Sequence, residues 1–262
     1  MIESISNAGV KLVVGLNAKS KLRKKENAFV VEGPRMVFET PKNLLKRVYI
    51  SENFPLSMEE ESQLKEYKDQ GVLVETVTEK IMKTMSDTVT PQGILAVVEK
   101  PVYKLKDVMG EVPLLLVLET IQDPGNLGTM FRTAEGAGVT GIIMTKDTVD
   151  VFSPKVVRST MGSLYRMPFV ITESLQSTIL LLKEEGLSFY AAHLEGKRTY
   201  DSFDYKKPSG FLIGNEGNGL TDEMTELADE KLIIPMEGKL ESLNAAMASG
   251  ILMYEAARQR RS

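Results

Sequence analysis

Residues 112–118 read Val-Pro-Leu-Leu-Leu-Val-Leu, and this run decides the fold class of the second half of the chain. A continuous apolar stretch of this length is typical of a strand buried on both faces. Further strands are expected after it at 141–144, 169–171, 187–192, 210–213 and 231–234, and helices around 129–138, 154–161, 174–185 and 221–228. This alternation predicts an α/β domain with a parallel sheet, whose ligands bind at the carboxyl ends of the strands.

The first hundred residues predict a smaller α/β domain. Helices are expected at 7–22, 33–40 and 57–70, and strands at 29–33, 47–51, 72–77 and 93–98. The stretch 99–106 is polar, contains Pro101 and fits neither period, so we place a linker here. The predicted domains are 1–100, a linker at 101–111, and 112–262. The last of them closes with a helix over 242–257, rich in small residues that allow another backbone to approach closely.

Composition limits the chemistry available to the 262 residues. The absence of cysteine removes disulfides, thiolate metal sites and cysteine nucleophiles. The only histidine, His193, is expected at a strand end in a structural or solvent role, although a dyad with a carboxylate stays open. We therefore expect no metal site. Apolar runs fall far short of the about 18–20 residues of a membrane span, and we expect a cytoplasmic protein without a secretory signal.

Charge is distributed unevenly along the chain, although the net charge is only −4. Residues 10–50 contain ten Lys or Arg and three acids, whereas residues 106–262 contain 16 basic and 22 acidic groups. This division suits a phosphate-binding platform beside a separate chemical site, and equally a solvated helical face. The candidate RNA-binding residues in the basic stretch are Lys21, Arg23, Lys24, Lys25 and Arg35.

Three segments carry the candidate chemistry. Residues 118–132 predict a strand, a glycine-containing loop and a helix bearing Arg132, with Asn126 in the loop. Residues 211–220 place Glu216 among three glycines just after a buried strand, which indicates a ligand loop rather than an ordinary turn. Residues 233–246 predict a strand, an irregular turn and a helix capped by Ser242, with Asn244 in its first turn. Singly, the first and third segments are also compatible with plain connections.

Together these segments resemble the SpoU (TrmH-type) RNA ribose 2′-O-methyltransferases of the SPOUT superfamily. The resemblance rests on Asn126-x-Gly128 with Arg132, on Gly214-x-Glu216-x-x-Gly219-Leu220, and on Ile234-Pro-Met followed by Ser242-Leu-Asn244. It covers roughly 112–260, with no departure from the catalytic pattern. Residues 27–33, Asn-Ala-Phe-Val-Val-Glu-Gly, also look like the start of an L30e-like RNA-binding domain, a looser match.

The resemblance implies S-adenosylmethionine as methyl donor, a deep trefoil knot in the C-terminal domain and a homodimer formed through that domain. It implies a ribose 2′-hydroxyl of RNA as the substrate. We expect 23S ribosomal RNA rather than transfer RNA, because a separate front domain suggests a structured target, and we expect no DNA partner. The residues that it implies for holding the cofactor are Gly214, Ile234, Met236, Ser242 and Leu243.

Arg132, Asn126, Glu216 and Asn244 are the expected catalytic residues. Arginine stays protonated in proteins, so we expect Arg132 to clamp a phosphate and stabilise the developing alkoxide rather than act as a base. Asn126 and Glu216 are expected to organise Arg132 and the loop, and Asn244 to add a polar contact. Two other classes stay open: a nucleotide-dependent oxidoreductase, which lacks the dinucleotide fingerprint, and a non-catalytic RNA-binding module.

Overall fold

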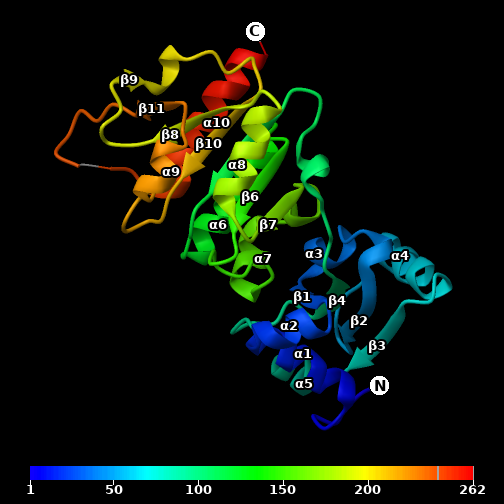
Figure 1. Ribbon diagram of the computed structural model, residues 1–262. Helices are drawn as coiled ribbons and strands as arrows, with labels where there is room; N and C mark the ends of the chain where they lie inside the picture. The colour runs from blue at the N-terminus through cyan, green and yellow to red at the C-terminus, as the bar shows by residue number, and fades with distance from the viewer. Residues whose placement is uncertain (241, 262) are drawn as a thin grey trace. The chain divides into compact units, whose positions relative to one another are not determined.

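The computed structural model describes residues 1–240 and 242–261, which form two compact units (Figure 1). The first unit comprises Met1–Val102 and Asp150–Tyr165, and the second comprises Tyr103–Val149 and Arg166–Ser262. The segment Asp150–Tyr165 thus packs with the first unit although it lies between two strands of the second in sequence. The functional domains predicted at 1–100 and 112–262 stay a prediction, because a packing unit and a functional domain need not coincide.

The first unit is built on a mixed four-stranded sheet in the order β1-β4-β2-β3. β4 pairs antiparallel with β1 and β2, and β2 pairs parallel with β3. A small α/β domain was predicted here, and the structure confirms it. Its strands are β1 (Ala28–Glu32), β2 (Leu45–Ser51), β3 (Leu73–Val77) and β4 (Ile94–Glu99). Its helices are α1 (Ala8–Ala18), α2 (Ser20–Lys25), α3 (Pro34–Phe38), α4 (Met58–Asp69), α5 (Glu79–Met85) and α7 (Pro154–Thr160), with 3-10 turns at Lys42–Leu44 and Ser163–Tyr165.

The single helix predicted over 7–22 is wrong, because the chain bends between α1 and α2. Lys19 has extended backbone angles, and the bend brings Leu22 back onto Gly15. A Cβ at Gly15 would lie 2.6 Å from Leu22 Cδ2, so a larger residue there would have to displace the end of the Leu22 side chain. Helix α5 was not predicted. It is capped by Thr78 and buries Ile81, Met82 and Met85 in the core of the unit.

The second unit contains a seven-stranded sheet in the order β7-β6-β5-β10-β8-β11-β9, and its paired strands are all parallel. The predicted parallel α/β fold is confirmed. β10 is inserted between β5 and β8, both of which precede it in the chain. The strands are β5 (Leu114–Leu118), β6 (Gly141–Thr145), β7 (Phe169–Thr172), β8 (Ser188–Ala192), β9 (Arg198–Thr199), β10 (Ser209–Ile213) and β11 (Glu230–Ile233). The helices are α6 (Pro124–Ala137), α8 (Leu175–Glu184), α9 (Asp222–Glu226) and α10 (Ala245–Arg260), with 3-10 turns at Leu105–Val108 and Tyr200–Ser202.

Strand β5 is buried along its whole length, as its apolar sequence predicts. Leu115 and Val117 pack in one core cluster with Ile143 of β6, Phe189 of β8 and Leu212 of β10. Burial of this apolar surface is the main source of stability in such a sheet. The parallel arrangement places the carboxyl ends of β5, β8, β10 and β11 along one edge, where the loops carrying the candidate residues begin.

Candidate active site

Helix α6 begins earlier than the sequence indicated, and this changes the first candidate segment. A loop was expected through Gly128, with the helix beginning at 129, but α6 starts at Pro124. Asp123 caps it, since its Oδ1 accepts a hydrogen bond of 2.8 Å from the backbone N–H of Asn126. Proline at the first helical position has no N–H to leave unsatisfied. Asn126 therefore lies in the first turn of a helix, on a fixed backbone.

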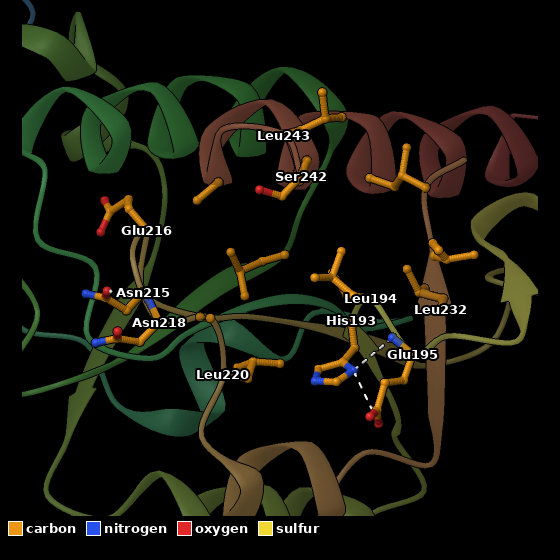
Figure 2. Close-up of a pocket in the computed structure, with 18 of the residues that line it drawn as sticks. His193, Leu194, Glu195, Asn215, Glu216, Asn218, Leu220, Leu232, Ser242 and Leu243 are labelled. Atoms are coloured by element: carbon orange, nitrogen blue, oxygen red, sulfur yellow. Dashed lines mark hydrogen bonds and ion pairs between the residues drawn. The ribbon is translucent and has the colours of Figure 1, made fainter. Parts of the chain in front are cut away.

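The second segment, residues 214–220, folds into a tight loop after β10. Asn215 and Gly219 exchange two backbone hydrogen bonds, of 3.0 and 2.9 Å. A Cβ at Gly214 would lie 2.1 Å from the backbone of Gly219, so this closure requires glycine at 214. Gly219 has a φ of +72°, which other residues adopt only with strain. The side chain of Glu216 is held at the outer end of this loop (Figure 2).

Glu216 joins the first two segments through hydrogen bonds to its carboxylate. Its Oε2 accepts from the backbone N–H of Gln122 at 3.0 Å, and its Oε1 accepts from that of Asp123 at 3.1 Å. The side-chain amide of Asn126 donates to Oε1 at 3.0 Å. Burial by itself would raise the pKa of Glu216, but these hydrogen bonds to the charged form outweigh it, and the pKa is lowered. The carboxylate is thus anionic and fully occupied in fixing the loop between β5 and α6.

Asn244 adds the third segment to the same network. Its Nδ2 donates to Asn126 Oδ1 at 3.0 Å, across 118 positions of sequence. Its Oδ1 accepts from the backbone N–H of Ala246 and Met247, at 2.9 and 3.3 Å, and so caps α10. The predicted N-cap, Ser242, is wrong, because the helix begins two residues later than expected and the amide of Asn244 takes its first N–H groups.

Arg132 lies on α6, but outside this network. Its side chain is exposed, and it makes no hydrogen bond or ion pair with any residue in 1–240 or 242–261. Glu216 and Asn126 were expected to organise both Arg132 and the loop. Their hydrogen bonds hold the loop and each other, and none of these bonds involves the guanidinium. Arg132 is therefore a positive charge on a rigid helix with its donors available to a substrate.

A cavity of about 500 Å³ opens beside the network (Figure 2). The five residues expected to hold a cofactor all line it: Gly214, Ile234, Met236, Ser242 and Leu243. A more open and more polar hollow adjoins it, lined by Gln122, Asp123, Asn126 and Asn244. The two share Glu216, Ser242 and Leu243 in their walls, so a ligand in the cavity can present one end to a ligand in the hollow.

Other residues of the cavity wall were not indicated by the sequence, among them His193, Leu194 and Leu232. His193 follows β8, and it was assigned a structural or solvent role. The sequence did contain a signal for a ligand-binding role of His193. The strand was expected to end at 192, and ligands bind at the carboxyl ends of parallel strands. Among the described residues, no group of three or more His, Asp or Glu is placed to hold a metal ion.

The candidate RNA-binding residues of the first unit differ in availability. Lys21, Lys24 and Lys25 are exposed on or at the end of α2, and Arg35 is exposed but paired with Glu39 at 2.9 Å. Arg23 is buried, and its guanidinium donates to Asp150 Oδ2 at 2.7 and 2.9 Å and to backbone carbonyl groups of α1. Burial and these hydrogen bonds take Arg23 out of the RNA-binding set.

Two family models match the chain. Residues 113–254 match the SpoU rRNA Methylase family, and residues 7–96 match the MRM3-like substrate binding domain. Across 97% of the chain and 97% of the relative, the sequence is 33% identical to the 23S rRNA (guanosine(2553)-2′-O)-methyltransferase RlmP of Bacillus subtilis. No helix among the described residues is long and apolar enough to cross a membrane.

Solved structures match over nearly the whole chain as well. The AdoMet-bound rRNA methyltransferase from Sinorhizobium meliloti is 32% identical and has a TM-score of 0.87, over 98% of this chain and 97% of that one. The SpoU methyltransferase AviRb from Streptomyces viridochromogenes, in complex with AdoMet, is 26% identical with a TM-score of 0.86, over 97% and 99% of the two chains.

Proposed function

We propose, since the chain belongs to the SpoU rRNA methylase family, that it transfers a methyl group from S-adenosylmethionine to a ribose 2′-hydroxyl of 23S ribosomal RNA. The observation that carries the proposal is that the cavity and the polar hollow adjoin each other. One wall, with Glu216 and Ser242, serves both. A methyl donor in the cavity and a ribose in the hollow would then meet there. Holding two reactants in such alignment supplies on the order of 7–11 kcal/mol in favourable systems.

The residues of the cavity suit S-adenosylmethionine. Its volume of about 500 Å³ lies within the range of roughly 300–1,000 Å³ for small-molecule sites. Apolar side chains of Leu220, Leu232 and Leu243 would cover a flat base, while Ser242 offers a hydroxyl group. The bound cofactor supplies an electrophilic methyl group on a sulfonium centre. Gly214, Ile234, Met236, Ser242 and Leu243 would hold it, as the resemblance implies.

The hydrogen-bonded network acts by fixing the backbone and side chains that line the polar hollow, where the ribose would bind. Glu216 holds two backbone N–H groups and Asn126, and Asn126 in turn receives the amide of Asn244. Each of the three is committed to another part of the site, so none is left to take the proton of the hydroxyl. We assign them a positioning role.

Arg132 is the residue that is left to bind negative charge on the substrate. A guanidinium carries five donors in a planar fork that matches the oxygens of a phosphate. We assign it the clamping of an RNA phosphate and the stabilisation of the alkoxide that develops on the ribose. A fixed donor aimed at developing charge is worth more in such a site than in water.

The RNA would be captured through Lys21 and Lys24, the exposed lysines of α2 that make no ion pair within the described residues, whereas Lys25 is paired with Glu26. We also propose a homodimer through the second unit, supported by the exposure of Met247 and Tyr254 on α10, at 60% and 48%. Light scattering tests the dimer, and substitution of both residues by aspartate should give a monomer.

Methylation mapping tests the proposed reaction. The purified chain, S-adenosylmethionine and unmodified 23S ribosomal RNA should yield one ribose-methylated nucleotide, detected by resistance to alkaline cleavage at that position. Transfer RNA serves as the comparison substrate. Methylation of transfer RNA alone would move the assignment to that substrate, and absence of both cofactor binding and methyl transfer would contradict an enzymatic role.

A further inference from the structure

His193 is the only histidine of the chain, and it lines the cavity that we assign to the cofactor. We propose that its Nε2–H donates a hydrogen bond to a ring nitrogen of the adenine base, which makes His193 a specificity-determining residue for S-adenosylmethionine. The inference rests on the proposed function and extends it to the far end of the cofactor.

The neighbours of the imidazole determine which nitrogen carries the proton. The backbone N–H of Glu195 donates to His193 Nδ1 at 3.2 Å, so Nδ1 acts as the acceptor. In a neutral imidazole one nitrogen accepts and the other donates, and the hydrogen bond at one settles the state of the other. The proton of neutral His193 therefore lies on Nε2.

The carboxylate of Glu195 does not compete strongly for Nδ1. Its Oε2 lies 3.9 Å from that nitrogen and 3.3 Å from Nζ of Lys231 on β11, which is the closer of the two. The backbone N–H of Glu195 thus remains the shorter contact. This arrangement fixes the ring and its donor before any ligand binds.

Nε2 has no hydrogen-bond partner within 1–240 or 242–261, and the side chain is 28% exposed. Figure 2 shows this nitrogen turned away from Glu195, on the side of the ring that faces Leu220. A donor in the wall of a mostly apolar cavity is the kind of polar group that fixes the orientation of a ligand.

The position of His193 indicates which part of the cofactor it meets. The reacting end must lie beside the polar hollow, hence near Glu216 and Ser242, which line both spaces. His193 lies on the opposite side of the cavity with Leu220 and Leu232 (Figure 2). Two parts of S-adenosylmethionine lie away from the methyl group, the charged amino-acid end and the adenine. Adenine suits the apolar side chains of Leu220 and Leu232, because it combines flat apolar faces with ring nitrogens that accept hydrogen bonds.

Three substitutions separate the donor from the bulk of the ring. In His193→Gln the amide nitrogen reaches the place of Nε2 and keeps a donor there. In His193→Asn the shorter amide reaches only the place of Nδ1, and His193→Phe keeps the ring without any donor. Calorimetry with S-adenosylhomocysteine should show binding weakened about tenfold for Asn and Phe, and less than about threefold for Gln, in line with one hydrogen bond.

Deaza analogues of S-adenosylhomocysteine identify the acceptor. Among the 1-, 3- and 7-deaza compounds, one should bind wild type about tenfold more weakly and bind His193→Phe no more weakly than the parent compound does. Equal binding by wild type, Asn and Phe, or a deaza penalty that persists in Phe, would overturn the role of His193. A wild-type chain that binds no S-adenosylmethionine and transfers no methyl group would overturn the proposed function itself.

Discussion

The basic stretch at residues 10–50 and the polar network at the sheet edge treat their charges in opposite ways. In the stretch, most cations are paired with acids of the first unit: Arg23–Asp150, Lys25–Glu26, Arg35–Glu39, Lys42–Glu66, Lys46–Glu99 and Arg47–Glu75. In the network, the anion Glu216 is satisfied by neutral amides, and the cation Arg132, which lies outside the network on α6, has no ion pair among the described residues.

The difference shows that a count of charges in sequence is a poor guide to the charge that a ligand meets. Six of the ten cations are paired with acids of their own unit, and few others, such as Lys21 and Lys24, remain for RNA. In the site, neutral donors satisfy the carboxylate and leave the arginine for substrate. Substitutions in the two regions should therefore affect different properties: stability in the first and the rate of methyl transfer in the second.

The largest effect is expected from Arg132→Ala. Loss of the donor that meets developing charge should lower the rate of methyl transfer about 10²–10³-fold. Cofactor affinity should stay within about threefold, because Arg132 does not line the cavity. Arg132→Lys should restore part of the rate, since it keeps the charge but not the planar fork. Single-turnover kinetics and calorimetry measure the two quantities, with the exposed Arg261→Ala as the control. A rate near wild type in Arg132→Ala would refute the assignment.

Arg23→Ala should lower the stability of the protein rather than the rate of methyl transfer. Its guanidinium is buried and bound to Asp150, and this pairing outweighs the effect of burial and lowers the pKa of the aspartate. Removal would leave a half-buried carboxylate without its partner, at a cost of about 3 kcal/mol in the free energy of unfolding. Urea titration should show this loss, while Lys24→Ala, an exposed neighbour, should unfold like wild type. Unchanged stability of Arg23→Ala would mean that the pair is not the anchor of α2.

The same two regions show what could be predicted from sequence. The strands could be predicted, because an apolar run such as 114–118 indicates a strand buried on both faces. The loop around Glu216 could be predicted as well, because its glycines imply an unusual backbone conformation. The burial of Arg23 could not, since its partner Asp150 lies 127 positions away. The contact of Asn244 with Asn126 spans 118 positions and depends on the order of strands in the sheet. The start of α6 was misplaced because Gly125 and Gly128 suggested a loop, whereas Asp123 and Pro124 begin a helix.

Glu216→Gln should lower the rate of methyl transfer by about tenfold, because a side-chain amide offers one acceptor oxygen where the carboxylate offers two.

The stability difference between wild type and Glu216→Gln should also depend on pH. The folded-state pKa of Glu216 is lowered, so its contribution to stability is present above the ordinary glutamate pKa and is lost as pH falls through the lowered value. Wild type should thus be more stable than the variant near neutral pH, and the two should converge in acid. Urea midpoints across this range measure the difference, and a constant gap would contradict the assignment.

The side chain of Asn244 has two roles that substitutions can test separately: its Oδ1 caps α10, and its Nδ2 contacts Asn126. Asn244→Ala removes the cap of α10 at a cost of about 1 kcal/mol. The melting temperature should fall by about 2–4 °C. Asn244→Ser keeps a cap but loses the amide that reaches Asn126, so it should melt near wild type and still transfer methyl groups more slowly. If the serine variant is as active as wild type, the Asn126 contact has no role in positioning.

The smallest effects are expected on α2, where the comparison can be tested directly. Lys21 and Lys24 are exposed and make no ion pair within the described part of the chain, so each should contribute one phosphate contact. Each alanine substitution should weaken RNA binding a fewfold and reduce the slope of log affinity against log salt by about 0.7–0.9. Lys42→Ala is the matched control, because Lys42 is engaged by Glu66. If Lys42→Ala changes the salt slope as much as Lys21→Ala does, pairing within the unit does not decide which cations bind RNA, and the contrast between the two regions fails.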